Sequence, residues 1–422
     1  MEPVDLFAIV LALAVLIGCI NYAWVRLPPA IGMLLGSLAV SLLVIGTDRL
    51  FHLHIMHRVR SVLDAADLPH FFLDGTVALL LFAGSLHVDV AELNRRRWLI
   101  LLLATASVVI STSIFGYGIY FSFALLNMAV PAAWCLVLGA VLAPTDAVVV
   151  ENLMQRSGLP AHLRAAIVGE SLFNDGAGVV LFLLALGVTH GDLIHFGHGR
   201  VIGALAREIA GGAMLGIVVG WLAAFLLRRI KDEGLQLLIS LALVLGCYRV
   251  ATLAALSGPI TVVTAGLCLS SPSSKFAMPP DTRAALIGFW SPLNQILNII
   301  LFLLMGLQIL DLLVSPADLL PILFAVPLAV VSRLVSVAVP LALTGENFSE
   351  KLRATTVLTW AGLRGGISIA LALTLPDSPW RTELLVITYA VVLFTIVIQG
   401  LTFPHCLRTA YGAEEQRSPE IA

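Results

Sequence analysis

The sequence predicts an all-α polytopic membrane protein with about thirteen transmembrane helices, each built on an apolar run of about 20 residues. Three observations predict this fold: few charges, long apolar runs, and basic residues gathered in alternate loops. Of the 422 residues, 59% are hydrophobic and 12% are charged, whereas a soluble domain carries about 25% charged residues. The apolar runs are continuous and do not alternate as the strands of a membrane barrel do. A net charge of −2 offers no basic surface for nucleic acid.

The apolar runs give the positions of the helices. The first run follows Glu2 and Asp5 and not a basic segment, so we interpret it as a retained span and not as a signal peptide. The ninth run is the shortest. The expected spans lie near residues 4–25, 30–47, 70–88, 98–123, 132–151, 163–188, 202–227, 234–253, 257–271, 284–310, 319–343, 353–375 and 381–403.

Basic residues predict the orientation of these spans. With the amino terminus outside, the loops that become cytoplasmic hold 15 lysines and arginines, and the opposite loops hold 7. Cytoplasmic loops are the ones that carry such an excess. The remaining two, Arg333 and Arg364, fall within expected spans. We therefore expect a multi-pass protein of the cell (inner) membrane, with its amino terminus outside and its carboxyl terminus in the cytoplasm.

Two spans contain helix-breaking residues at matching positions. The fifth is interrupted at residues 143–146, which include a proline, and the twelfth at residues 361–366, which include three glycines. If spans 1–6 and 8–13 are related halves, corresponding spans are seven apart along the chain. Because seven is odd, corresponding spans cross the membrane in opposite directions, and the halves are two inverted six-helix repeats. Paired breaks in such repeats are typical of a binding site in the middle of the membrane. We therefore expect broken helices that cross at mid-membrane.

Charged and polar residues inside the spans are the candidate functional residues, because a charge at the bilayer centre is costly and usually marks a pathway. On a helix, Glu170 and Asn174 share one face. Ser171 and Asp175 share the adjacent face, and Asp175 is expected to face Asp146 of the preceding span. The candidates are Asp146, Glu170, Asn174, Asp175, Arg333 and Arg364.

These residues predict a site for a small cation. Two carboxylates (Asp146 and Asp175), the Ser171 hydroxyl and backbone carbonyls freed by the break provide hard oxygen ligands. A proton and a cation compete for the same carboxylates, which by itself gives a cation/proton exchanger. Glu170 is interpreted as half of a buried ion pair, with Arg333 or Arg364 as its partner. Spacing does not choose between the two arginines.

The motifs at residues 144–146, 169–176 and 362–366 resemble the monovalent cation/proton antiporter family, in its NhaP and eukaryotic NHE sodium/proton exchanger branch. The resemblance covers nearly the whole chain. It assigns ion and proton binding to Asp175, with Asp146, Asn174, Ser171 and the Thr145 carbonyl lining the same site. It also implies that Asn174, where electrogenic relatives carry a second aspartate, sets one-for-one exchange.

The resemblance also implies an architecture. We expect a homodimer of transporters in which a core domain (about 70–188 and 284–403) moves like an elevator against dimerisation helices (about 4–47 and 202–271). Residues 1–403 form one membrane unit and residues 404–422 a short cytoplasmic tail. The partners are membrane lipids, protons and a monovalent cation, with Na⁺ expected and Li⁺ and K⁺ not distinguished. No cofactor is expected beyond the transported ions.

An enzymatic function is the alternative. Asp146 and Asp175 on neighbouring spans would resemble the dyad of an intramembrane aspartyl protease, in which two close carboxylates share a proton. The GxGD pattern of those proteases is absent from the sequence. Transport is therefore the preferred function, and we expect the protein not to be an enzyme.

Overall fold

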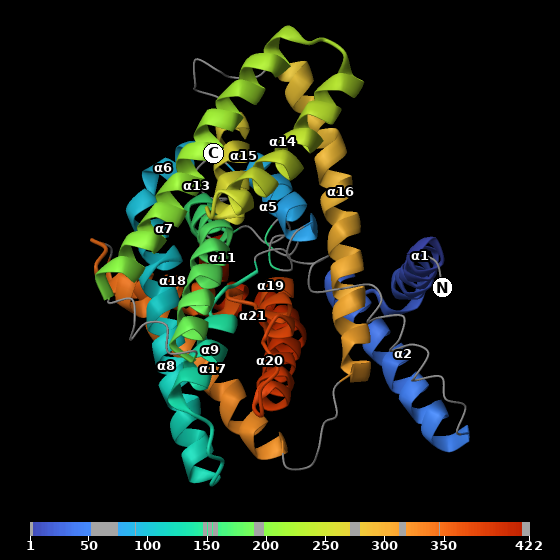
Figure 1. Cartoon of the computed structure of the whole chain (residues 1–422), viewed down its shortest axis with the longest axis vertical. Coiled ribbons are helices and arrows are strands. Elements are labelled where there is room, and N and C mark those ends of the chain that lie inside the picture. The colour runs from blue at the N-terminus through green and yellow to red at the C-terminus, as the bar shows by residue number, and fades with distance from the viewer. Residues whose placement is uncertain are drawn as a thin grey trace.

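All regular structure in the described residues is helical, as Figure 1 shows. The computed structural model describes residues 3–51, 75–88, 90–146, 150, 154, 159–189, 198–270, 279–311, 318–345 and 347–415. The α-helices are α1 (Pro3–Ile20), α2 (Pro29–Phe51), α5 (Val77–Leu86), α6 (Val90–Arg95), α7 (Arg97–Ala104), α8 (Ala106–Leu125), α9 (Ala132–Val141), α11 (Ala161–Thr189), α13 (His198–Arg229), α14 (Glu233–Leu253), α15 (Gly258–Ser270), α16 (Pro280–Leu307), α17 (Leu319–Ala342), α18 (Phe348–Ala361), α19 (Gly366–Leu373), α20 (Arg381–Phe394) and α21 (Gly400–Glu415). Shorter helices of other types are the π-helical η1 (Asn21–Val25) and η5 (Thr395–Gln399) and the 3₁₀ turn η3 (Gln308–Asp311).

Most of the expected spans are long membrane helices. Nine helical stretches of the described residues are long and apolar enough to cross a membrane, and the bent pair of α18 and α19 makes a tenth. The other three expected spans, near 70–88, 132–151 and 257–271, coincide with the shorter apolar helices α5, α9 and α15. The chain is therefore an all-helical polytopic membrane protein, and the count of thirteen spans stays a prediction.

The two expected interruptions are present. Helix α9 ends at Val141, and residues 144–146 are not helical. Pro144 lacks an amide hydrogen, and proline disfavours helical backbone at the residue before it. Helix α18 ends at Ala361 and α19 begins at Gly366, with a bend of 51° between them. Residues 147–149 and 151 of the fifth expected span lie outside the described residues.

The helices pack as two sets, which Figure 1 shows as neighbouring groups. We call α1, α2, α5 and α13–α16 the flanking set, and α6–α9, α11 and α17–α21 the core set. In the flanking set α13 packs along α15, α2 along α16, and α5 along α15. In the core set α8 packs along α9 and α17, and α9 along α11. Helices α5 and α16, which the sequence analysis groups with the core, pack mainly against the flanking set.

Small residues allow the closest of these contacts. Gly212, Gly216 and Gly220 recur every four residues on α13, and a Cβ atom at any of them would overlap backbone atoms of residues 257–265. Close backbone approach through small residues is how helices associate when both are surrounded by lipid. The flanking set therefore has the packing expected inside a membrane.

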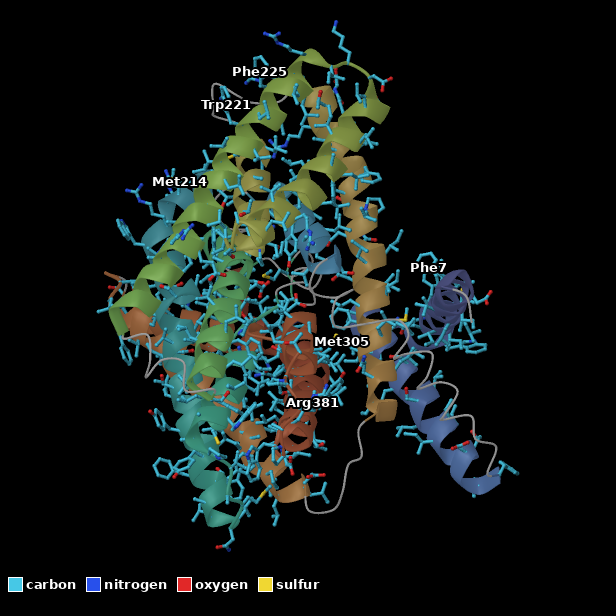
Figure 2. All side chains as sticks on the ribbon, viewed as in Figure 1. Phe7, Met214, Trp221, Phe225, Met305 and Arg381 are labelled. Carbon is cyan, nitrogen blue, oxygen red and sulfur yellow. The ribbon has the colours of Figure 1, made fainter. Side chains whose placement is uncertain are left out.

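Large apolar side chains cover the outside of the molecule. Figure 2 shows Phe7 on α1 and Met214, Trp221 and Phe225 on α13 pointing away from the helices behind them. Met214 is 66% exposed and Trp221 is 48% exposed. Exposed apolar faces of this kind suit contact with lipid. A helix that spans the bilayer pairs its own backbone N–H and C=O groups, so only its side chains meet the lipid.

Candidate ion-binding site

The two helix breaks meet inside the core set. The backbone amide of Asp146, at the first break, donates a hydrogen bond of 2.7 Å to the carbonyl of Leu363, at the second. The approach is so close that a Cβ atom at Gly365 would overlap the Asp146 side chain. Only glycine leaves room for this contact. The sequence predicts the two breaks, and the structure shows that they are in direct backbone contact.

Arg364 fills the space between the breaks. Its side chain is 2% exposed, and its Nη1 donates hydrogen bonds to the carbonyls of Ala143 (2.6 Å) and Pro144 (3.1 Å). These carbonyls follow the end of α9, where helical backbone leaves acceptors without partners. A cation is also favourable at the negative end of the helix dipole. Arg364 thus stabilises the first break from the second.

Thr395 supports the same crossing from the π-helical turn η5. Its hydroxyl accepts a hydrogen bond of 3.1 Å from the Arg364 backbone amide and donates one of 3.0 Å to the Val392 carbonyl. Thr395 is 3% exposed. Sequence reasoning missed this residue, because a threonine in an apolar run gives no signal of its own.

Glu170 is paired with Arg333. Both guanidinium Nη atoms of Arg333, on α17, bond the two carboxylate oxygens of Glu170, on α11, and the Nη2–Oε2 distance is 2.9 Å. Arg333 Nη2 also donates to the carbonyl of Leu358 at 3.2 Å. The pair is buried and joins α11, α17 and α18. Of the two arginines that the sequence left open as partners, Arg333 makes the ion pair and Arg364 bonds the backbone.

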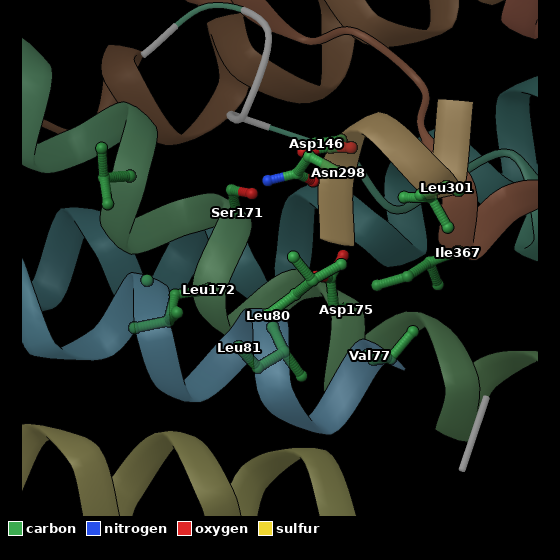
Figure 3. A pocket seen from close by; sticks show the side chains of 13 residues that line it. Val77, Leu80, Leu81, Asp146, Ser171, Leu172, Asp175, Asn298, Leu301 and Ile367 are labelled. Carbon is green, nitrogen blue, oxygen red and sulfur yellow. The ribbon is translucent and has the colours of Figure 1, made fainter. Parts of the chain in front are cut away.

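A pocket lies where the core set faces the flanking set. Asp146, Ser171 and Asp175 line it on the core side, as Figure 3 shows. Asp175 is 7% exposed. The remaining wall comes largely from apolar side chains of α5, α11, α16 and α19. Three of the predicted site residues therefore place side-chain oxygen atoms at one cavity, whose other walls are largely apolar.

The other two predicted ligands bond each other. Asn174, on α11, donates a hydrogen bond of 2.7 Å from Nδ2 to the Thr145 hydroxyl. Both side chains are buried, and neither belongs to the residues that line the pocket. This bond fixes the non-helical segment 144–146 to α11, so in this structure the two residues position Asp146.

Asn298 is a pocket residue that sequence reasoning missed. It lies on α16, is 7% exposed, and lines the same cavity as Asp146 and Asp175 (Figure 3). The signal in the sequence is weak: one amide within the apolar run 296–304. An asparagine carries no charge, and Asn298, unlike Asn174, has no charged residue beside it in the sequence.

The oxygen atoms that line the pocket suit a hard cation. In the part of the chain that the structure describes, no group of three or more histidine, cysteine, aspartate or glutamate side chains is placed to hold a metal ion. Two carboxylates and neutral oxygens are hard ligands without the nitrogen or sulfur that zinc or copper prefers.

Comparisons with known proteins identify the family. The model of the family described as "Sodium/hydrogen exchanger, transmembrane" matches residues 9–409. The chain belongs to the sodium/hydrogen exchanger family. This exchanger is 36% identical over 429 residues to the Na(+)/H(+) antiporter NhaP of Pseudomonas aeruginosa, covering 99% of each chain. It is 30% identical to the Na(+)/H(+) antiporter NhaG of Bacillus atrophaeus, over 90% of this chain and 72% of that one.

A solved structure shares the fold of this exchanger. The sodium proton antiporter MjNhaP1 from Methanocaldococcus jannaschii superposes with a TM-score of 0.72, covering 97% of this chain and 98% of the other at 19% identity. The resemblance expected from the motifs is thus confirmed at the level of the NhaP-type family. The protein is a sodium/proton antiporter, and the alternative of an intramembrane protease gives way to a transporter that is not an enzyme.

Proposed function

We propose that this exchanger binds Na⁺ and H⁺ in turn at the pocket lined by Asp146, Ser171 and Asp175. The observation that carries the proposal is that two carboxylates from separate elements, the first helix break and α11, reach one cavity between the two sets of helices. Carboxylate and hydroxyl oxygens are suitable ligands for a small hard cation. The apolar walls around them strengthen every charge interaction inside.

Competition for the carboxylates couples the two ions. A carboxylate enclosed by apolar side chains is unfavourable when its charge is not neutralised, and either a proton or a cation neutralises it. Asp175 is the shared carrier, and Asp146 and Ser171 complete the cation site. Arg364 donates its hydrogen bonds to the backbone carbonyls of residues 143 and 144 and is not a ligand of the exchanged ions in this proposal.

Two pairs of residues have supporting roles. The Glu170–Arg333 ion pair holds three core helices together, and the Asn174–Thr145 hydrogen bond holds the first break against α11. Asn174 stands where electrogenic relatives carry a second aspartate, and on this resemblance one Na⁺ exchanges for one H⁺ and the cycle is electroneutral. Transport that is insensitive to an imposed membrane potential is the expected result, and a strong voltage dependence contradicts it.

Alternating access follows from movement of the core set against the flanking set. The pocket lies between them, so sliding one set along the other exposes it to each side in turn. The proposed topology has thirteen spans in two inverted repeats, with the amino terminus outside the inner membrane. The proposed homodimer interface lies on the flanking set, and the exposed apolar face of α13 supports this placement.

The test is exchange by purified protein in proteoliposomes with an imposed pH gradient. Asp175→Asn removes the carrier charge with little change in shape, and it should abolish Na⁺-dependent dissipation of the gradient. Asp377→Asn is the matched control, because Asp377 lies in an exposed loop beyond α19. Near-normal exchange by Asp175→Asn overturns the site. Adding Li⁺ and K⁺ in turn to the wild-type protein ranks the cations.

A further inference from the structure

Helix α16 is attached to the flanking set along its whole length. Near its amino end, Gln236 of α14 donates a hydrogen bond of 3.0 Å to the Thr282 hydroxyl. Two turns on, the Trp290 indole donates one of 3.0 Å to Ser240, also on α14. Trp290 is fully buried and packs edge-on against Phe82 of α5. The first half of α16 is therefore fixed to α14 and α5.

The second half of α16 is fixed to α2. The hydroxyl of Ser41 donates a hydrogen bond of 3.0 Å to the carbonyl of Gly306, and Ser37 makes a longer one of 3.5 Å to that of Phe302. A Cβ atom at Gly306 would overlap Ser37, so the two helices are in backbone contact. When the core set moves, these ties keep α16 with the flanking set.

Asn298 lies between these two attachment regions, and its amide orientation is fixed. Its Nδ2 is 2.9 Å from the Asn294 carbonyl and 3.3 Å from the Asn294 side-chain oxygen. Two acceptors on one side identify that end of the amide as nitrogen. The other end is therefore the carbonyl oxygen Oδ1, which is buried and has no hydrogen-bond partner among the described residues.

An unpartnered oxygen in this place needs a positive partner. Burying an unsatisfied acceptor is costly, and Asn298 lines a pocket whose other polar groups include two carboxylates. Carboxylates accept hydrogen bonds and do not donate them unless they are protonated. A bound cation coordinates Oδ1 and both carboxylates at once, and a proton on one carboxylate lets that group donate to Oδ1, so each of the two exchanged ions can satisfy this acceptor.

We propose that Asn298 is a further ligand of the transported cation, supplied by the flanking set to a site otherwise built by the core set. The inference rests on the proposed function of Asp146 and Asp175. Its Oδ1 coordinates Na⁺ when the core set brings these carboxylates against α16, and it is left behind when the core set moves away. The cation site is therefore complete in one access state and lacks one ligand in the other.

The consequence is an affinity for Na⁺ that differs between the two faces of the membrane. Loss of one neutral oxygen ligand is expected to raise the apparent KM for Na⁺ about tenfold, or about 1.4 kcal/mol. This rise in KM should occur only on the face of the membrane to which the cation site opens when Asn298 is one of its ligands. A role in packing alone gives a different result, because a change in packing alters the stability of the protein and does not favour one face of the membrane over the other.

The experiment compares Asn298→Leu with wild type in right-side-out and everted membrane vesicles, with KM and kcat measured on each face. The expected result is an approximately tenfold higher KM on one face, with KM on the other face and kcat each changed less than about threefold. Thr282→Val is the matched control, since it removes another polar group from α16 at a distance from the pocket. An unchanged KM on both faces, or an equal rise on both, overturns the proposal.

A second variant keeps the test decisive where Asn298→Leu fails to accumulate. Asn298→Asp keeps the shape and adds a charge, so it should lower the KM for Na⁺ at alkaline pH on the face that Asn298→Leu affects. No change on either face overturns the proposal. Asp175→Asn in the same vesicles separates the two claims. If Asp175→Asn is inactive and Asn298→Leu behaves as wild type, the ligand role of Asn298 is overturned and the proposed function stands. If Asp175→Asn is fully active, the proposed function and the ligand role of Asn298 are both overturned.

Discussion

The flanking set and the core set bury different kinds of polar group. The ties within the flanking set are neutral: hydroxyls of Ser37, Ser41 and Ser240 and the amide of Gln236 bond neighbouring helices. The core set contains Glu170, Asp175, Arg333 and Arg364, which are all the buried charged side chains of the described residues. Neutral ties between membrane helices are weak, whereas buried charges are expensive. We therefore interpret the flanking set as the scaffold and the core set as the part that carries the ion-binding site.

The two sets also differ in their backbones. The long helices of the flanking set run without a break, and α13 alone has 32 residues. The core set contains the interruptions at residues 142–146 and 362–365, and both of these lie at the pocket. Because non-helical backbone is tolerated within a membrane only where other groups satisfy it, the buried charges and the breaks belong together. Comparable substitutions in the core set and in the flanking set therefore test whether the two sets differ in function.

The largest effect is expected from the buried ion pair. Glu170→Gln leaves Arg333 as an unneutralised charge, and breaking a buried pair in this way lowers the free energy of unfolding by about 3–5 kcal/mol. Stability in detergent is the measurement, with the KM for Na⁺ beside it. The double variant Glu170→Leu with Arg333→Met removes both charges and should recover much of the stability. Normal stability with a raised KM would instead place Glu170 among the ion ligands.

The next effect concerns the contact between the breaks. Gly365→Ala adds a methyl group that overlaps the Asp146 side chain, and kcat/KM should fall at least tenfold, or about 1.4 kcal/mol. Gly288→Ala is the flanking-set control, because a Cβ atom at Gly288 meets no neighbour within 4 Å. It should leave transport unchanged and favour the helix slightly. Equal losses from the two variants would contradict the difference between the sets.

An effect of similar size is expected at Thr395. Thr395→Val leaves the Arg364 amide without its acceptor, and an unsatisfied buried donor costs about 1–3 kcal/mol. Unfolding in detergent measures the loss, and exchange activity should fall with it because the amide is part of the crossing. Thr395→Ser keeps the hydroxyl and serves as the control. Wild-type stability in Thr395→Val would mean that η5 does not support the second break.

The smallest effect is expected in the flanking set. Ser41→Ala removes the hydrogen bond to Gly306, and hydrogen bonds between membrane helices contribute about 0.6 kcal/mol on average. Stability should fall by about that amount, with the KM for Na⁺ unchanged. A loss as large as that of Glu170→Gln would show that neutral ties in the flanking set matter as much as charges in the core set.

The sequence predicts the parts of this molecule that depend on local chemistry. Apolar runs predict the helices, and the breaks are predicted because Pro144 and the glycines near 365 act on the backbone where they stand. The charged candidates were found because a charge inside a span is conspicuous. Asp146, Ser171 and Asp175, predicted as neighbours, line one pocket.

The parts that depend on packing could not be predicted. Glu170 had two possible partners, and only the placement of α17 beside α11 gives Arg333 the pair. The grouping of α16 with α2 rests on serine and glycine contacts that many membrane helices offer. Asn298 carries no charge, so its position in the pocket became visible only once α16 was placed.

The central claim is that Na⁺ and H⁺ compete for the same carboxylates, and proton release on Na⁺ binding tests it most directly. Calorimetric titration of the purified protein with Na⁺, in buffers of different ionisation enthalpy, counts the protons released. The expected result is about one H⁺ released for each Na⁺ bound, as for other cations that displace protons from their ligands, with the release lost in Asp175→Asn. Na⁺ binding with the same heat in every buffer, and hence without proton release, would contradict the claim.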